Sequence, residues 1–299
     1  MVNSKRTTGA WSALLVCLAC AGVFIAAADA TRHAAATPST AAAARGAGRF
    51  IWQDLVTRDV AACRKFYGEL LGWEFQEMTR RGRPYLVARS QGRLVGGIIE
   101  GKDPSITRAA WLSFLAVDDL ARAVAMVTAS GGKVLREAVE IRGLGRFAVV
   151  TDPQGAALGL ARLEVDPPAG VGDSGVGQFF WREYFARDAP GALTFYRNLN
   201  GYEARLSERA QVEYHILERD GSQAGLLPIP KEFTGVTPNW LPYVRVADPQ
   251  PLVARVESLG GKVLLPPQPG IRDGSVAIIA DPTGGAVALQ KWPIVKESS

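Results

Sequence analysis

The most constraining feature of this sequence is an internal repeat at a fixed offset. Trp52 recurs as Trp181 and Asp59 recurs as Asp188, and the members of each pair lie 129 positions apart. A constant offset indicates two copies of one folding unit of about 115 residues, with no net insertion between the matched positions. Further pairs at the same offset are Phe66-Tyr67 with Phe195-Tyr196, Gly72 with Gly201, Tyr85 with Tyr214, Trp111 with Trp240, and Asp152-Pro153 with Asp281-Pro282.

Two stretches of biased composition frame the copies. Residues 31–48 are mainly Ala with Thr, Pro, Ser and Gly, which is too little bulk for a core, so we expect a tether. Residues 166–177 (DPPAGVGDSGVG) are rich in Pro and Gly, as expected of a linker. The sequence therefore predicts one domain at residues 49–165 and a second at residues 178–293.

The N-terminus is typical of an export signal. Two basic residues precede an apolar run at residues 13–28, and Ala28-Asp29-Ala30 fits the small-x-small rule for cleavage. Residues 1–30 are thus predicted to be a signal peptide, which would send the protein to the periplasm or outside the cell. Two alternatives stay open: an uncleaved membrane anchor, and a lipoprotein acylated at Cys20.

Charge and cysteine content exclude several classes of function. The net charge of +5 is spread along the chain without a Lys/Arg run, so nucleic acid is not an expected partner. Only Cys63 lies beyond the predicted signal, so a mature protein has no intrachain disulfide. Cys63 falls on the apolar face of a predicted helix, which favours a buried thiol over a reactive one.

Each copy divides into two modules of the order strand–helix–strand–strand–strand. Helices are predicted at residues 59–72 and 119–130 from their apolar spacing, with Gly72 as a C-terminal stop. Four such βαβββ modules in tandem predict an α+β fold with large curved antiparallel sheets. We expect a cleft between modules to bind a small molecule.

Three motifs follow one another in a fixed order: Asp59 to Phe66-Tyr67 and Leu71-Gly72-Trp73, then Val117-Asp118-Asp119-Leu120, then Asp152-Pro153-Gln154-Gly155 with its copy Asp281-Pro282-Thr283-Gly284. In this order they resemble the vicinal-oxygen-chelate superfamily, also called glyoxalase/bleomycin-resistance/dioxygenase domains, and in particular a two-domain glyoxalase-like subgroup. In metal-dependent members, a His on the first strand of each module and a Glu after D-P-x-G bind a divalent metal, which acts as a Lewis acid.

The positions that match the family's metal ligands hold no ligating side chains. His33 lies in the predicted tether, which leaves His215 as the other histidine of the chain. The resemblance therefore implies no metal and no cofactor at the family's site. The matched positions are Trp52, Trp181, Leu112, Leu241, Gly159 and Ala288.

An acid follows each tryptophan by two positions, as Asp54 and Glu183. Strand side chains alternate, so Trp52 with Asp54, and Trp181 with Glu183, are expected to share the cleft face. Three interpretations are open. Each acid accepts hydrogen bonds from the backbone or from an arginine, or holds a polar ligand beside tryptophan, or acts as a general base. The candidate arginines are Arg142, Arg146, Arg182 and Arg272.

The leading prediction is a metal-independent exported protein that binds a small aromatic or polar-conjugated molecule, without nucleic acid, and with a homodimer left open. The alternative is a glyoxalase-type lyase, isomerase or dioxygenase with a shifted metal site of Asp54, Glu183 and His215; no catalytic residue is assigned. Trp111 and Trp240 are expected to line the cleft or cap its rim. The predicted ligand-binding residues are Trp52, Asp54, Tyr85, Trp181, Glu183 and Tyr214.

Overall fold

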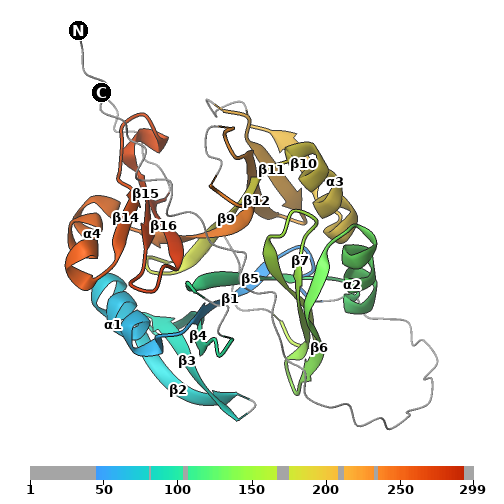
Figure 1. The fold of residues 1–299 in the computed structure, drawn as a ribbon, viewed down its shortest axis with the longest axis horizontal. Coiled ribbons are helices and arrows are strands. Elements are labelled where there is room, and N and C mark those ends of the chain that lie inside the picture. The colour runs from blue at the N-terminus through green and yellow to red at the C-terminus, as the bar shows by residue number, and fades with distance from the viewer. Residues whose placement is uncertain are drawn as a thin grey trace.

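In the computed structural model, the described residues form two eight-stranded sheets and four α-helices (Figure 1). The structure describes residues 45–80, 82–103, 107–166, 175–207, 212–231 and 235–292, so the predicted signal and most of the tether and linker lie outside the described residues. None of the helices in this part of the chain is long and apolar enough to cross a membrane.

Domain 1 is the first sheet with its two helices, and each module keeps the predicted order. The first strands of the two modules, β1 and β5, pair antiparallel at the centre, and β1 and β5 pair parallel with β4 and β8. The strand order is therefore β2-β3-β4-β1-β5-β8-β7-β6. The elements are β1 (Phe50–Thr57), α1 (Val60–Leu71), β2 (Glu74–Arg80), β3 (Arg83–Ser90), β4 (Arg93–Glu100), β5 (Ala110–Ala116), α2 (Leu120–Ala129), β6 (Lys133–Ile141), β7 (Gly145–Thr151) and β8 (Ala157–Leu163).

Domain 2 repeats this arrangement with β9 and β13 at the centre. Its order is β10-β11-β12-β9-β13-β16-β15-β14, which confirms the predicted tandem βαβββ fold. The elements are β9 (Phe179–Ala186), α3 (Ala189–Asn200), β10 (Glu203–Leu206), β11 (His215–Arg219), β12 (Ser222–Pro228), β13 (Asn239–Val246), α4 (Pro249–Val256), β14 (Lys262–Leu265), β15 (Val276–Ala280) and β16 (Ala286–Lys291), with short 3-10 turns η2 (Glu257–Leu259) and η3 (Arg272–Gly274).

Each α-helix begins after an aspartate because the carboxylate accepts a hydrogen bond from a free backbone N–H of the first turn. Asp59 accepts from the Ala62 N–H at 2.9 Å, and Asp188 accepts from the Gly191 N–H at 3.0 Å. Asp119 and Asp248 cap α2 and α4 in the same way. Gly72 and Gly201 end α1 and α3 in the left-handed conformation, as predicted.

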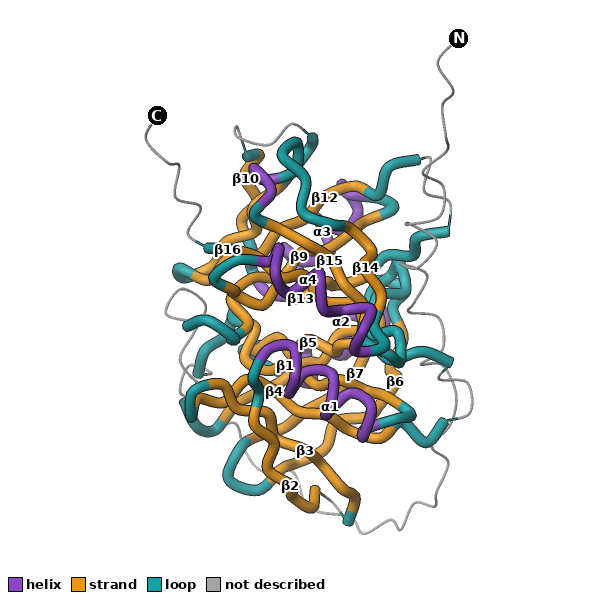
Figure 2. The backbone as a smooth tube through the Cα atoms, turned by 90° about the vertical axis from the view of Figure 1, so that its left-hand side faces the viewer, coloured by secondary structure: helices purple, strands orange, loops and turns teal. Residues whose placement is uncertain are grey.

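The helices pair across the two domains. α1 contacts α4 on one flank and α2 contacts α3 on the other, while β5 contacts β13 at the centre (Figure 1). The backbone view turned by 90° shows the strands of domain 1 in the lower half and those of domain 2 in the upper half (Figure 2). Two core clusters contain residues of both domains, for example Leu120 with Tyr196, and Phe66 with Val256. Among the described residues, the opposite face of each sheet carries no α-helix, and we call it the helix-free face.

Candidate functional site

On the helix-free face of domain 1, three predicted ligand-binding residues meet. The Trp52 Nε1–H donates to Asp54 at 2.8 Å and lies 3.0 Å from the Tyr85 hydroxyl. The Tyr85 hydroxyl donates to the same Asp54 oxygen at 2.5 Å. Asp54 and Tyr85 are buried, whereas Trp52 is half-buried. We call these three residues the domain 1 cluster.

The close approach of Tyr85 to Asp54 depends on a glycine. Gly97 of β4 lies directly opposite Asp54 in the parallel pair of β1 and β4. A Cβ atom added at Gly97 would overlap the Tyr85 hydroxyl and lie 2.5 Å from the Asp54 Oδ1 atom. Gly225 of β12 has the same relation to Tyr214 and Glu183. Glycine therefore leaves the space in which phenol and carboxylate meet.

On the helix-free face of domain 2, the matched residues form a larger cluster. The Tyr214 hydroxyl donates to the Glu183 Oε1 atom at 2.7 Å and accepts from the Trp181 Nε1–H at 3.1 Å. Tyr243 donates to Glu183 Oε2, and the Arg272 Nη2 group donates to Glu183 Oε1 in an ion pair. These five residues are the domain 2 cluster.

Electrostatics keep two tyrosines and the arginine of the domain 2 cluster protonated. Burial and the nearby Glu183 carboxylate raise the pKa of Tyr214 and of Tyr243, so both phenols stay protonated and donate. Burial alone would lower the pKa of Arg272, but Glu183 and the two tyrosines raise it above its ordinary value. Glu183 therefore corresponds to the interpretation in which the acid accepts from Arg272 and from protein hydroxyls.

The residues on the helix-free faces do not fit the family's metal site. Trp52 lies opposite Phe114 and Trp181 lies opposite Tyr243, whereas Leu112 and Leu241 lie opposite the acids Asp54 and Glu183. A Cβ atom at Gly159 would overlap the Phe114 ring, so this ring fills the matched position. Among the described residues, no three His, Cys, Asp or Glu side chains gather.

His215 does not join the acids. It pairs with Leu226 on β12, whose side chain lies in the core under the helices, whereas Gly225 pairs with Glu183. His215 is therefore on the opposite sheet face from Glu183, and its Nε2 atom lies 2.9 Å from Glu213. The alternative metal site of Asp54, Glu183 and His215 would need His215 on the helix-free face, so the structure does not bring these three side chains together.

Trp111 and Trp240 were expected at the cleft, but both are buried on the helix side. The Trp111 indole donates to the Tyr67 hydroxyl at 3.0 Å, and Tyr67 donates to Asp281 of domain 2 at 2.9 Å. Trp240 repeats this chain: its indole donates to the Tyr196 hydroxyl of α3 at 2.8 Å, and Tyr196 donates to Asp152 of domain 1 at 2.9 Å. The repeated motif residues therefore build the domain interface.

The single described cysteine also belongs to this interface. Cys63 is fully buried and its sulfur lies 3.2 Å from the Thr283 hydroxyl of domain 2. Burial, with a contribution from the nearby Asp281 charge, raises the pKa of the Cys63 thiol to about 12. The thiol is thus protonated and enclosed, as predicted from its helical position.

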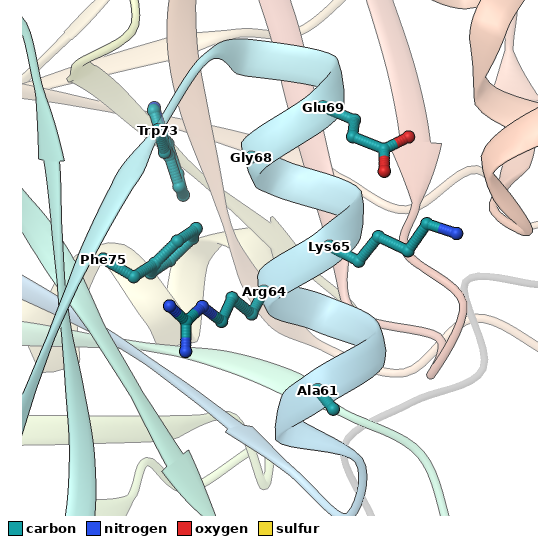
Figure 3. Close-up of a pocket in the computed structure, with 7 residues that line it drawn as sticks. All are labelled: Ala61, Arg64, Lys65, Gly68, Glu69, Trp73 and Phe75. Atoms are coloured by element: carbon teal, nitrogen blue, oxygen red, sulfur yellow. The ribbon is translucent and has the colours of Figure 1, made fainter.

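A surface hollow of about 410 Å³ lies beside α1, away from both clusters (Figure 3). Arg64 and Lys65 extend along its side, and the Arg64 guanidinium pairs with Glu77 at 2.8 Å. Phe75 and Trp73 form its aromatic part (Figure 3). None of the predicted ligand-binding residues borders this hollow.

Sequence reasoning missed Tyr243 and named Arg272 as one of several arginine partners. Tyr243 has Phe114 at the matched position of the first copy, so the repeat gives no polar signal there. Arg272 reaches Glu183 from η3, a turn whose path cannot be inferred from strand periodicity. Trp52 and Asp54, and likewise Trp181 and Glu183, share a sheet face because side chains alternate along β1 and β9.

Comparison with known proteins agrees with this architecture. The model of the Glyoxalase/Bleomycin resistance protein/Dioxygenase superfamily matches residues 49–160. A protein of Mycobacterium bovis and Mycobacterium tuberculosis named as a provisional glyoxylase, CFP32, is 30% identical over 250 residues, which is 80% of this chain and 93% of the relative. The anthracycline biosynthesis protein DauV of Streptomyces sp. strain C5 is 32% identical over 257 residues, which is 80% of this chain and 91% of that protein.

Solved structures share the fold at low identity. The Mn(II)-bound glyoxalase from Novosphingobium aromaticivorans has a TM-score of 0.55 at 13% identity, covering 83% of each chain. Homoprotocatechuate 2,3-dioxygenase from Arthrobacter globiformis has a TM-score of 0.56 at 14% identity, covering 85% of this chain and 82% of that chain. With the two relatives aligned over nearly their whole length, these findings show that the chain belongs to the Glyoxalase/Bleomycin resistance protein/Dioxygenase superfamily.

Proposed function

We propose that this chain is an exported, metal-independent binding protein for small planar aromatic molecules. The observation that carries the proposal is the pair of half-buried indoles on the helix-free faces, Trp52 and Trp181, each oriented by a hydrogen bond from its Nε1–H. An oriented indole gives a flat apolar wall whose ring adds stacking energy to area burial. Indole has no lone pair for a metal, so these walls suit stacking better than chelation.

The polar groups at the edge of each indole favour a ligand that carries oxygen atoms. In each cluster a tyrosine hydroxyl and a carboxylate lie next to the indole. An apolar surface with a few fixed polar groups is typical of sites that bind and orient conjugated small molecules. The relatives named for anthracycline biosynthesis favour the same ligand chemistry, because an anthracycline is a fused aromatic ring system that carries oxygen substituents.

The test is quenching of tryptophan fluorescence by 1,4-dihydroxyanthraquinone, a planar probe with ring oxygens. We expect saturable quenching in the full chain and at least tenfold weaker binding in Trp52→Ala or Trp181→Ala, whichever indole contacts the probe. The urea midpoint should change less than binding does. Trp292→Phe, an exposed indole outside both clusters, is the reference for non-specific quenching.

A parallel loss of binding and stability in both alanine variants would assign the indoles to the core and contradict the proposal. Absence of saturable quenching in the parent chain would contradict it directly.

Export rests on the apolar run at residues 13–28 and the small residues that follow it. N-terminal sequencing of the protein from a periplasmic fraction should give Thr31 as the first residue. An intact N-terminus in the membrane fraction would favour the anchor instead.

A further inference from the structure

The two helix-free faces differ at the positions around the acid. Domain 2 carries polar or amphipathic side chains where the 129-residue offset places glycine or apolar residues in domain 1. The difference does not involve the acids themselves, and it gives domain 2 donor groups that the matched positions of domain 1 lack. The matched pairs are Arg272 with Gly143, Tyr243 with Phe114, and Gln290 with Ala161.

Arg272 places a guanidinium at the rim of the domain 2 cluster. Its Nη2 group donates to Glu183, and its Nη1 group donates to the Gln290 Oε1 atom at 2.9 Å. Its carbon Cζ lies 5.7 and 5.4 Å from the ring centroids of Tyr214 and Tyr243. The side chain keeps 29% of its surface exposed. A guanidinium fork held in this way suits a planar oxyanion.

Gln290 adds a donor without a protein partner. It lies on β16 two positions after Ala288, on the helix-free face, and only 1% of its surface is exposed. Its Oε1 atom accepts from Arg272, which orients the amide and leaves Nε2 as the donor; Nε2 has no hydrogen-bond partner among the described residues. Buried side-chain donors are nearly always satisfied, so this amide points to an acceptor outside the described chain.

The segment that covers Gln290 has an unusual backbone. Arg272 and Asp273 of η3 have φ angles of 48° and 53°, which place two consecutive non-glycine residues in the left-handed region. Such residues carry conformational strain and often occur where a ligand is bound. Arg272, which holds the Gln290 amide, is therefore itself one of the two strained residues.

We infer that domain 2 selects aromatic ligands that carry a negatively charged oxygen, with Arg272 and Gln290 as the residues that determine this specificity. The inference rests on the proposed function, and it assigns the two domains different preferences. In the complex, N–H groups of Arg272 and the Gln290 Nε2–H donate to the ligand oxyanion, and Trp181 covers the ring. Domain 1 offers phenyl and methyl groups at the matched positions and takes uncharged rings.

Three probes with the same ring and different charge test the inference: 2-naphthoate, 2-naphthamide and 2-naphthylmethylammonium. Isothermal titration of the full chain should give at least tenfold tighter binding for 2-naphthoate than for the cation. Gln290→Leu keeps the side-chain volume and removes the orphan donor, so it should reduce this preference by about fivefold or more without loss of folding. Arg272→Met should remove the preference, and circular dichroism checks that this variant is folded.

Lys65→Ala is the matched control because the hollow beside α1 also combines a cation with aromatic side chains (Figure 3). It should leave the preference for 2-naphthoate unchanged. Binding of all three probes with equal affinity, or a preference that Gln290→Leu leaves intact or that Lys65→Ala removes, would overturn the inference while the proposed function stands. Failure of all three probes to bind would overturn both.

Discussion

At the scale of single residues, the two clusters show what the acids after the tryptophans do. Glu183 accepts from Tyr214, Tyr243 and Arg272, so both of its oxygens are already occupied. A carboxylate with three donors at a buried position is an anchor for protein side chains first. In the complex proposed above, ligand contacts in domain 2 therefore fall to Trp181, Arg272 and Gln290.

Removal of the Glu183 charge should destabilise the protein through Arg272. Glu183→Gln leaves the guanidinium without its counter-charge, and because Arg272 is partly exposed the expected loss is about 2 kcal/mol in the free energy of unfolding, below the range for a fully buried pair. Urea denaturation of Glu183→Gln, Arg272→Met and the double variant measures the coupling. Losses that simply add in the double variant would show that the pair is not coupled.

Two substitutions of glycine by alanine should change the free energy of unfolding in opposite directions. Gly97→Ala puts a methyl group into the Tyr85–Asp54 contact and should cost about 2 kcal/mol of unfolding free energy. Gly68→Ala, in the interior of α1, meets only ordinary contacts at 3.5 and 3.7 Å and should gain about 0.5 to 1 kcal/mol. Thermal melts of both variants test the pair, and a stable Gly97→Ala would contradict the packing described for the domain 1 cluster.

Alternation along the first strand of each domain predicted that Trp52 and Asp54, and Trp181 and Glu183, share one sheet face. The repeat singled out Tyr85 and Tyr214 as a matched pair, but it did not predict that each tyrosine donates to the acid of its domain. Tyr243 could not be predicted, since the first copy has Phe114 at the matched position and the repeat gives no polar signal there.

At the scale of elements, the sequence predicted helices and strands well because each module has a strong start signal. The aspartate that opens each helix supplies its N-cap, and the glycine that closes the first helix of each domain supplies its C-cap. What the pattern could not supply is the partner of each helix. An amphipathic face requires a covering surface but does not identify it, and here α1 packs against α4 of the other domain.

Loss of one cap tests the energetic role of these aspartates. Asp119 accepts from the Arg122 N–H at 3.1 Å at an exposed position. Asp119→Ala should lower the free energy of unfolding by about 1 kcal/mol, whereas Asp119→Asn keeps an acceptor and should change it by less than half of that. Equal effects of the two variants in urea denaturation would assign the effect to charge and not to the cap.

At the scale of the whole molecule, two reciprocal hydrogen-bond chains join the domains. Tyr67 of domain 1 donates to Asp281, and Tyr196 of domain 2 donates to Asp152. Both carboxyls are buried, and burial raises the pKa of each above its ordinary value despite the hydrogen bonds that stabilise the charge. Burial at the interface therefore disfavours the charged forms of Asp152 and Asp281, which costs free energy when they ionise.

This cost predicts a pH dependence of stability. Because the folded-state pKa values of Asp152 and Asp281 are raised, the folded protein binds more protons than the unfolded chain just above the ordinary carboxyl pKa of about 4. Their contribution to stability is greatest below that value and is lost as pH rises through the raised pKa values. The double variant Asp152→Asn/Asp281→Asn should make the slope of unfolding free energy against pH less negative above about pH 4. Urea titrations that give equal slopes for variant and parent would contradict the assignment.

The reciprocal chains also bear on the origin of the fold. Every contact that Tyr67 makes with the second copy is mirrored by Tyr196 with the first, and Trp111 and Trp240 support them in the same manner. A half-length ancestor could have satisfied the same groups by associating with itself about a two-fold axis. Fusion of the two genes would then have freed each copy to diverge on its helix-free face, while the shared interface kept both under the same constraint.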